Sequence, residues 1–71
     1  MARDRLIHER RIRRFTQRHV AERVGVTFQM ISEVERGKRT PSLGVANKLE
    51  DLFQIPSRQL LALREENPQI D

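Results

Sequence analysis

Apolar residues recur along this chain at intervals of three or four positions, and no stretch alternates convincingly between apolar and polar residues. Such spacing is typical of amphipathic helices that bury one face, whereas a half-buried strand alternates at every second residue. Residue types that cap, turn or end helices interrupt the pattern at Thr16, Gly25–Thr27, Gly37–Pro41, Pro56–Ser57 and Pro68. The pattern therefore predicts an all-α fold of five helical segments joined by tight connections.

Each predicted segment has apolar positions that can pack into one shared core. The segments are expected at about residues 3–14, 17–24 and 28–36, from about residue 42 onward, and from Pro56–Ser57 onward. The apolar positions that define their packed faces are Leu6 and Ile7; Val20, Ala21 and Val24; Ile31 and Val34; Leu43, Ala46, Leu49 and Phe53; and Leu60, Leu61 and Leu63. The pattern favours a single compact helical domain.

The connection between the second and third segments is the sharpest local signal. Only Gly25, Val26 and Thr27 separate these two helices, and a short turn that contains Gly is typical of a helix-turn-helix. Thr16 and Thr27 are suited to cap the two helices, and Gly25 to take a positive φ at the end of the first. An ordinary helical hairpin in a small bundle would show the same spacing.

Length and composition limit the chemistry that this chain can carry out. Its 71 residues allow one domain, expected over residues 1–66 and followed by a short tail over residues 67–71. Cysteine is absent, and the two histidines, His8 and His19, fall on different predicted helices without metal-ligand spacing. No nucleophile motif or glycine-rich phosphate loop occurs. We therefore expect no enzymatic activity, catalytic residue, metal, cofactor or small-molecule ligand.

The charge is concentrated at one end of the sequence. The chain carries 14 basic and 10 acidic residues, and residues 1–39 hold 11 of the basic and 5 of the acidic ones. A basic half indicates a polyanionic partner, although a well-solvated surface would explain the same composition. No apolar run approaches the roughly 20 residues of a membrane span, and the charged first residues do not form a signal peptide. A cytoplasmic protein without a membrane contact is expected.

A set of residues at fixed spacing resembles the XRE-type helix-turn-helix family, which includes Cro and the lambdoid phage repressors. The matching residues are Thr16-Gln17, Ala21, Val24-Gly25-Val26, Thr27, Ile31-Ser32, Glu35-Arg36-Gly37-Lys38 and Pro41-Ser42. The resemblance extends over about residues 3–64 and implies a lambda-repressor-like DNA-binding domain whose third helix enters the major groove. Arg14 departs from the pattern, because the family usually has Gly there. An Arg either takes a left-handed conformation, at a cost of about 1 kcal/mol, or ends the helix differently.

The exposed face of the third helix supplies the candidates for base readout. A helical wheel with Ile31 and Val34 inward directs the polar residues outward, and the start of such a helix meets the base edges. Gln suits adenine, ionised Glu suits the cytosine amino group, and a Phe ring can cover a thymine methyl group. The candidates are Thr27, Phe28, Gln29, Ser32 and Glu33. For Phe28, packing at the border of the core is an equal alternative.

Phosphate contacts are expected from neighbouring positions. Gln17 lies at a helix N-terminus, where free N–H groups favour an anion, and the family binds phosphate with the matching Gln. The other candidates are Thr16, Arg10, Arg36, Lys38, Arg39 and Thr40. The resemblance further implies that Arg10 and Glu35 form a structural ion pair beneath the DNA-facing surface.

These features together predict a bacterial or phage-encoded transcription regulator. We expect it to repress or autoregulate a promoter through a palindromic operator in double-stranded DNA. One helix reads only about four or five base pairs, so we expect a homodimer. Leu60 and Leu63 are candidates for its interface, although they can equally close the monomer core. The alternative function is a protein-interaction module of the same fold, such as an antitoxin that neutralises a partner protein.

Overall fold

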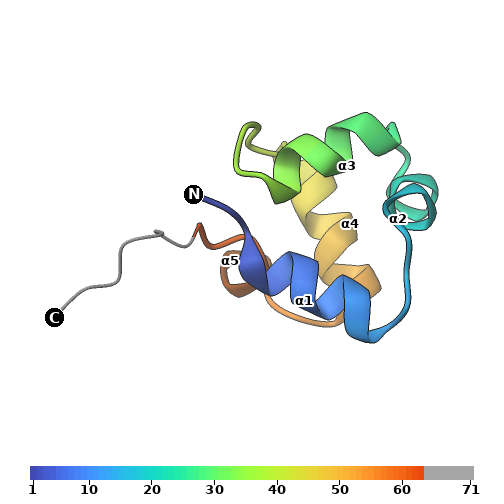
Figure 1. Cartoon of the computed structure of the whole chain (residues 1–71), viewed down its shortest axis with the longest axis horizontal. Coiled ribbons are helices and arrows are strands. Elements are labelled where there is room, and N and C mark those ends of the chain that lie inside the picture. The colour runs from blue at the N-terminus through green and yellow to red at the C-terminus, as the bar shows by residue number, and fades with distance from the viewer. Residues whose placement is uncertain (64–71) are drawn as a thin grey trace, which may run out of the picture.

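The computed structural model describes residues 1–63, and the fold over this range consists of five helices (Figure 1). The helices are α1 (Asp4–Ile12), α2 (Gln17–Val24), α3 (Phe28–Glu35), α4 (Leu43–Phe53) and α5 (Ser57–Leu60). The prediction of an all-α fold with five helices is confirmed. The expected tail over residues 67–71, and the end of the expected domain after residue 63, lie outside the described residues.

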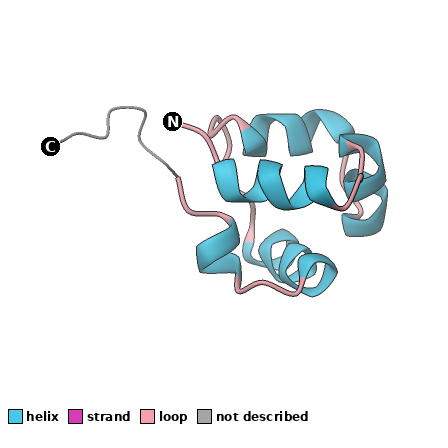
Figure 2. Ribbon diagram, turned by 60° about the horizontal axis from the view of Figure 1, so that its bottom comes forward, coloured by secondary structure: helices cyan, strands magenta, loops and turns pink. Residues whose placement is uncertain are grey.

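All five helices contribute to one core, and short loops join them at the periphery (Figure 2). The fully or almost fully buried apolar side chains are Leu6, Val20, Ala21, Val24, Ile31, Val34, Leu49, Phe53 and Leu60. Each of these positions was expected on a packed face. Burial of a Leu or Phe side chain contributes roughly 1.5–3 kcal/mol, so these residues supply most of the stabilisation of so small a fold.

Four predicted apolar positions differ from this pattern. Leu43 is 77% exposed, so the expectation that it shares the packed face of α4 is wrong. It is the first residue of α4 and extends beyond the end of the core. Ile7 and Leu61 are only half-buried, and Leu63 is 43% exposed because it follows α5, which ends at Leu60.

The helix starts follow the local chemistry of the sequence. The hydroxyl groups of Thr16, Thr27 and Ser42 accept hydrogen bonds from backbone N–H groups three residues later, at 2.9, 3.1 and 3.3 Å. Each bond satisfies one of the N–H groups that a helix N-terminus leaves without an intrahelical partner. The caps predicted at Thr16 and Thr27 are therefore confirmed. Gly25 ends α2 with a φ of 82°, the left-handed conformation expected for it.

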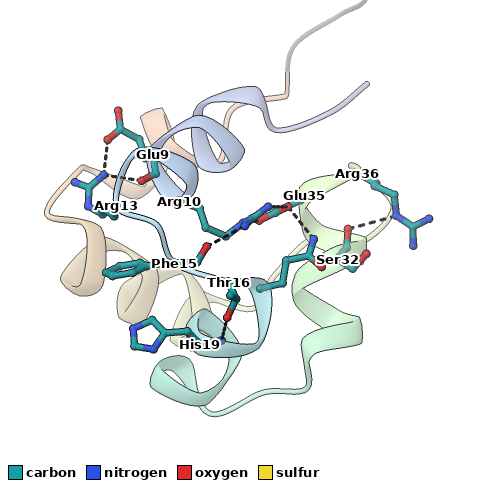
Figure 3. A network of polar contacts seen from close by, with 10 residues as sticks. Glu9, Arg10, Arg13, Phe15, Thr16, His19, Ser32, Glu35 and Arg36 are labelled. Atoms are coloured by element: carbon teal, nitrogen blue, oxygen red, sulfur yellow. Dashed lines mark hydrogen bonds and ion pairs between the residues drawn. The ribbon is translucent and has the colours of Figure 1, made fainter.

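Arg13 ties α1 to α4. Its guanidinium group donates to a carboxylate oxygen of Glu9 at 2.6 Å and to the backbone carbonyl of Phe53 at 3.0 Å. It also lies 5.2 Å from the centre of the Phe53 ring, within the range of a cation–π interaction. Hydrogen bonds from Arg13, and then from Arg5, lower the pKa of the Glu9 carboxyl group. The pair Glu9–Arg13 is drawn in Figure 3.

Arg14 takes the left-handed conformation that the family pattern reserves for Gly. Its φ is 58°, and its N–H donates to the carbonyl of Arg11 while the N–H of Phe15 donates to that of Arg10. This pair of bonds is the Schellman motif, which satisfies the last carbonyl groups of a helix. Of the two alternatives for Arg14, the strained conformation is therefore the one adopted.

Replacing Arg14 by Gly is expected to stabilise the protein by about 1 kcal/mol, because Gly takes a positive φ without steric cost. The Arg14 side chain is exposed, so little contact is lost. Thermal unfolding should show a rise of about 4–8 °C. The matched control is Arg11→Gly inside α1, where Gly should destabilise by about 1 kcal/mol. Equal losses for both variants would contradict the assigned strain.

Candidate nucleic-acid interface

Helices α2 and α3 pack directly against each other and are joined by the three residues Gly25, Val26 and Thr27. Val26 is half-buried and packs against the core, which fixes the turn between the helices. Ile31 and Val34 are fully buried, so the opposite side of α3 is the side that faces outward. The arrangement is a helix-turn-helix whose second helix presents a polar surface.

The five candidates for base readout lie together on or beside this surface. Thr27, Phe28 and Gln29 are exposed, while Ser32 and Glu33 are half-buried. A shallow concavity of about 240 Å³ opens between α3 and the loop that follows it. It is lined by Thr27, Gln29, Met30, Glu33 and Arg39. The structure therefore groups the predicted polar side chains on one surface that is accessible to solvent.

Phe28 projects outward instead of joining the core. Its side chain is 47% exposed, and the guanidinium carbon of Arg18 lies 5.3 Å from the centre of its ring. The contact joins the first turns of α2 and α3 through a cation–π interaction. Arg18 was not among the predicted site residues, because a single Arg on a polar helix face gives no signal of a ring partner elsewhere in the chain. The Phe28 ring is thus partly covered by Arg18, and its role in base readout stays a prediction.

A buried carboxylate lies beneath the polar surface. Arg10 and Glu35 form a two-pronged ion pair, with distances of 2.5 Å from Nε to Oε2 and 3.2 Å from Nη2 to Oε1 (Figure 3). The Glu35 side chain is only 4% exposed. Gln17 donates to Glu35 Oε1 at 3.0 Å, and Arg10 Nη1 donates to the carbonyl of Phe15 at the same distance. These bonds join α1, α2 and α3 behind the polar surface.

The candidates for phosphate contact divide into two groups. Thr16, Gln17 and Arg10 lie around the start of α2, where Gln17 and Arg10 are already hydrogen-bonded to Glu35. The remaining four follow or end α3 and are exposed: Arg36, Lys38, Arg39 and Thr40. The Nε atom of Arg36 lies 3.4 Å from the carbonyl of Ser32, and Arg39 pairs with Glu33. The basic residues of the second group border the polar side of α3.

Arg3 is a structural residue that the sequence pattern did not reveal. It is 4% exposed, and burial lowers the pKa of its guanidinium group. Its Nη1 atom donates to the carbonyls of Val34 at 2.8 Å and Arg39 at 3.2 Å, and its Nε donates to that of Leu61 at 3.0 Å. Its backbone N–H donates to the carbonyl of Glu35 at 2.9 Å. Arg3 thus joins the end of α3, the loop after it and the end of α5.

Two further findings bear on other kinds of site. Within residues 1–63, no group of three or more His, Cys, Asp or Glu side chains is arranged to hold a metal ion. None of the described helices combines the length and the apolar character needed to cross a membrane.

Comparison with known proteins agrees with this geometry. The chain matches the Helix-turn-helix family over residues 7–60. It is 36% identical over 53 residues to the uncharacterized HTH-type transcriptional regulator YgzD of Bacillus subtilis, covering 75% of this chain and 80% of that protein. It is 29% identical over 51 residues to YazB, another uncharacterized HTH-type transcriptional regulator of that organism, covering 72% and 74%.

A solved structure shares the fold. The restriction-modification controller protein C.AhdI from Aeromonas hydrophila superposes with a TM-score of 0.72 at 32% identity. The match covers 80% of this chain and 86% of that one. The family match, the relatives and the shared fold lead to one conclusion. This chain belongs to the helix-turn-helix family, and within it to the XRE type.

Proposed function

We propose that this protein is a DNA-binding transcription regulator that binds a palindromic operator as a homodimer and represses or autoregulates the neighbouring promoter. The observation that carries the proposal is the division of α3 into two sides. On one side of α3, Ile31 and Val34 pack into the core. The other side presents polar side chains next to the basic loop after Gly37. The relatives named as transcriptional regulators and the controller protein of the same fold support this function.

Base readout is assigned to the outward side of α3. The Gln29 amide can donate and accept at once, which matches N6 and N7 of adenine. Ser32 can serve a base or a phosphate, and Thr27 lies at the end of α3 that meets base edges in this family of domains. The exposed Phe28 ring, held beside Arg18, offers an apolar surface to a thymine methyl group. Glu33 completes the set, because its carboxylate can accept a hydrogen bond from the amino group of cytosine.

Orientation on the duplex is assigned to phosphate contacts on both sides of α3. The start of α2 provides free backbone N–H groups and the Gln17 amide, together with Thr16 and Arg10. The other side provides the exposed loop residues Arg36, Lys38, Arg39 and Thr40. Such contacts fix register without reading sequence and make binding depend strongly on salt.

The dimer follows from the amount of sequence that one helix can read. A half-site of about four or five base pairs is too short to define one operator in a genome, whereas two half-sites about 34 Å apart double the readout. Leu60 is fully buried within the monomer, so it is not available for contact with a second copy. Leu63 is the remaining candidate for the contact. Sedimentation should show dimers at tens of micromolar, and monomers without cooperative binding would contradict the dimer.

Replacing Gln29 by Ala is expected to weaken binding to the preferred operator by about 1–3 kcal/mol and to leave binding to random DNA nearly unchanged. The reason is that the amide contacts base edges only in the correct sequence. Titration of the protein with operator and random duplexes measures both affinities. The matched control is Lys38→Ala, which should weaken both alike and reduce the salt slope by about one unit. Equal losses on both duplexes for Gln29→Ala would defeat the readout assignment.

A further inference from the structure

Arg39 differs from Lys38 and Thr40, the residues on either side of it, because its side chain as well as its backbone is held by hydrogen bonds. Its carbonyl accepts a hydrogen bond from the buried guanidinium group of Arg3 at 3.2 Å. Its own Nε donates to Oε1 of Glu33 at 2.8 Å. In contrast, the Lys38 side chain has no hydrogen bond or ion pair with any residue in the described range. A side chain that is already ordered loses less conformational entropy when it binds a ligand.

The local backbone explains why Arg39 lies beside α3. Gly37 has a φ of 77°, its N–H donates to the carbonyl of Val34, and the N–H of Lys38 donates to that of Glu33. These bonds form a Schellman motif that turns the chain back along the helix it has just left. Arg39 therefore lines the same concavity as Thr27 and Gln29 instead of pointing away from it.

The pairing with Glu33 leaves the far end of the guanidinium group open. Nε is occupied by the carboxylate, while neither terminal amino group has a hydrogen-bond partner among the residues that the structure describes. Two parallel N–H donors at this spacing match O6 and N7 of guanine in the major groove. A lysine is a compact point charge and cannot make this two-pronged contact.

We infer that Arg39 reads a guanine in each half-site and that Glu33 is its positioning residue. The inference rests on the proposed DNA-binding function and deepens it. It reassigns Arg39 from phosphate contact to base contact, and it makes Glu33 act through Arg39 instead of by accepting from cytosine. The Glu33 carboxylate also balances the charge of Arg39 next to the duplex, so Arg39 provides selectivity more than general attraction.

The test changes each partner of the Arg39–Glu33 pair separately and together. Arg39→Lys keeps the positive charge but removes the two-pronged donor, and Glu33→Gln removes the carboxylate. Bound sequences are selected from random duplexes with the unaltered protein, Arg39→Lys, Glu33→Gln, the double variant that carries both changes, and Arg58→Lys. Affinities are then measured on single-base variants of the preferred operator. Arg39→Lys should lose discrimination for one guanine by about 5- to 150-fold, with the salt slope unchanged. Glu33→Gln should relax the same position. Arg58→Lys, at an exposed position on α5, is the matched control and should leave the profile intact.

Other results would overturn the inference in distinguishable ways. If Arg39→Lys keeps the full profile, Arg39 binds phosphate and the inference fails while the proposed function stands. If Glu33→Gln alters a different base position from Arg39→Lys, Glu33 reads a base directly and is not the positioning residue. If the unaltered protein selects no sequence at all, the proposed function fails and the inference fails with it. If the double variant Arg39→Lys with Glu33→Gln loses no more discrimination than Arg39→Lys alone, the two residues act as one unit, which supports the pairing.

Discussion

Replacing Glu35 by Ala is expected to destabilise the fold by about 3–5 kcal/mol, the largest effect of any single change considered. The Arg10 side chain is only 12% exposed and would keep its charge without the carboxylate that now neutralises it. At roughly 0.05–0.15 kcal/mol per residue, a chain of this length has a total unfolding free energy of roughly 4–10 kcal/mol. Urea unfolding followed by circular dichroism should therefore show a large loss of stability, or a partly unfolded protein in buffer.

The control for this effect removes both charges at once. The double variant Arg10→Ala with Glu35→Ala leaves no isolated buried charge, so it should be more stable than Glu35→Ala alone. Arg5→Ala breaks the more exposed ion pair of Arg5 with Glu9, and it should lower the free energy of unfolding by less than about 1 kcal/mol. A loss below about 1 kcal/mol for Glu35→Ala would show that the buried pair contributes no more than a surface one.

Replacing Arg3 by Ala is expected to cost about 3 kcal/mol. The change removes the donor to the carbonyls of Val34, Arg39 and Leu61, and buried acceptors without partners are costly. Binding to the operator should also weaken in the fraction that stays folded, because the loop carrying Arg39 loses its anchor. Urea unfolding measures the first effect and duplex titration at low temperature the second.

Arg5→Ala serves as the control for Arg3 as well. It removes the same kind of side chain two residues later, from a position on the solvent side of α1. A similar, small effect of both variants on stability would mean that the three carbonyl groups are solvated as well by water as by the guanidinium group. The role assigned to Arg3 would then be wrong.

Local chemistry allowed much of the fold to be predicted from the sequence. The threonine caps at Thr16 and Thr27 and the left-handed Gly25 depend on residues within a few positions of each other, so the pattern is sufficient. The buried positions of α2 and α3 follow from helical periodicity in the same way. Leu43 was misplaced because periodicity gives the face of a helix but not how far the core extends along it.

Contacts between distant segments could not be predicted in this way. Arg3 looks like one more surface Arg in a basic stretch, and its acceptors lie 31, 36 and 58 residues away. Arg39 can pair with Glu33 only because the chain reverses direction at Gly37. The local sequence pattern locates this turn but does not show which side chains the turn brings together. The ion pair of Arg10 with Glu35 was expected only because of the family resemblance. At the candidate site, the sequence indicated which residues lie on one surface but not which of their side chains form hydrogen bonds or ion pairs with each other.

Selection of bound sequences from random DNA duplexes tests the central claim most directly. The structure presents the polar side of α3 to solvent, and the proposed homodimer would place two copies of this helix on two half-sites. The proposed function therefore predicts one enriched inverted repeat, with half-site centres about one helical turn, or 34 Å, apart. Recovery of duplexes with no shared sequence, bound as tightly as the starting pool, would contradict the claim of sequence-specific regulation.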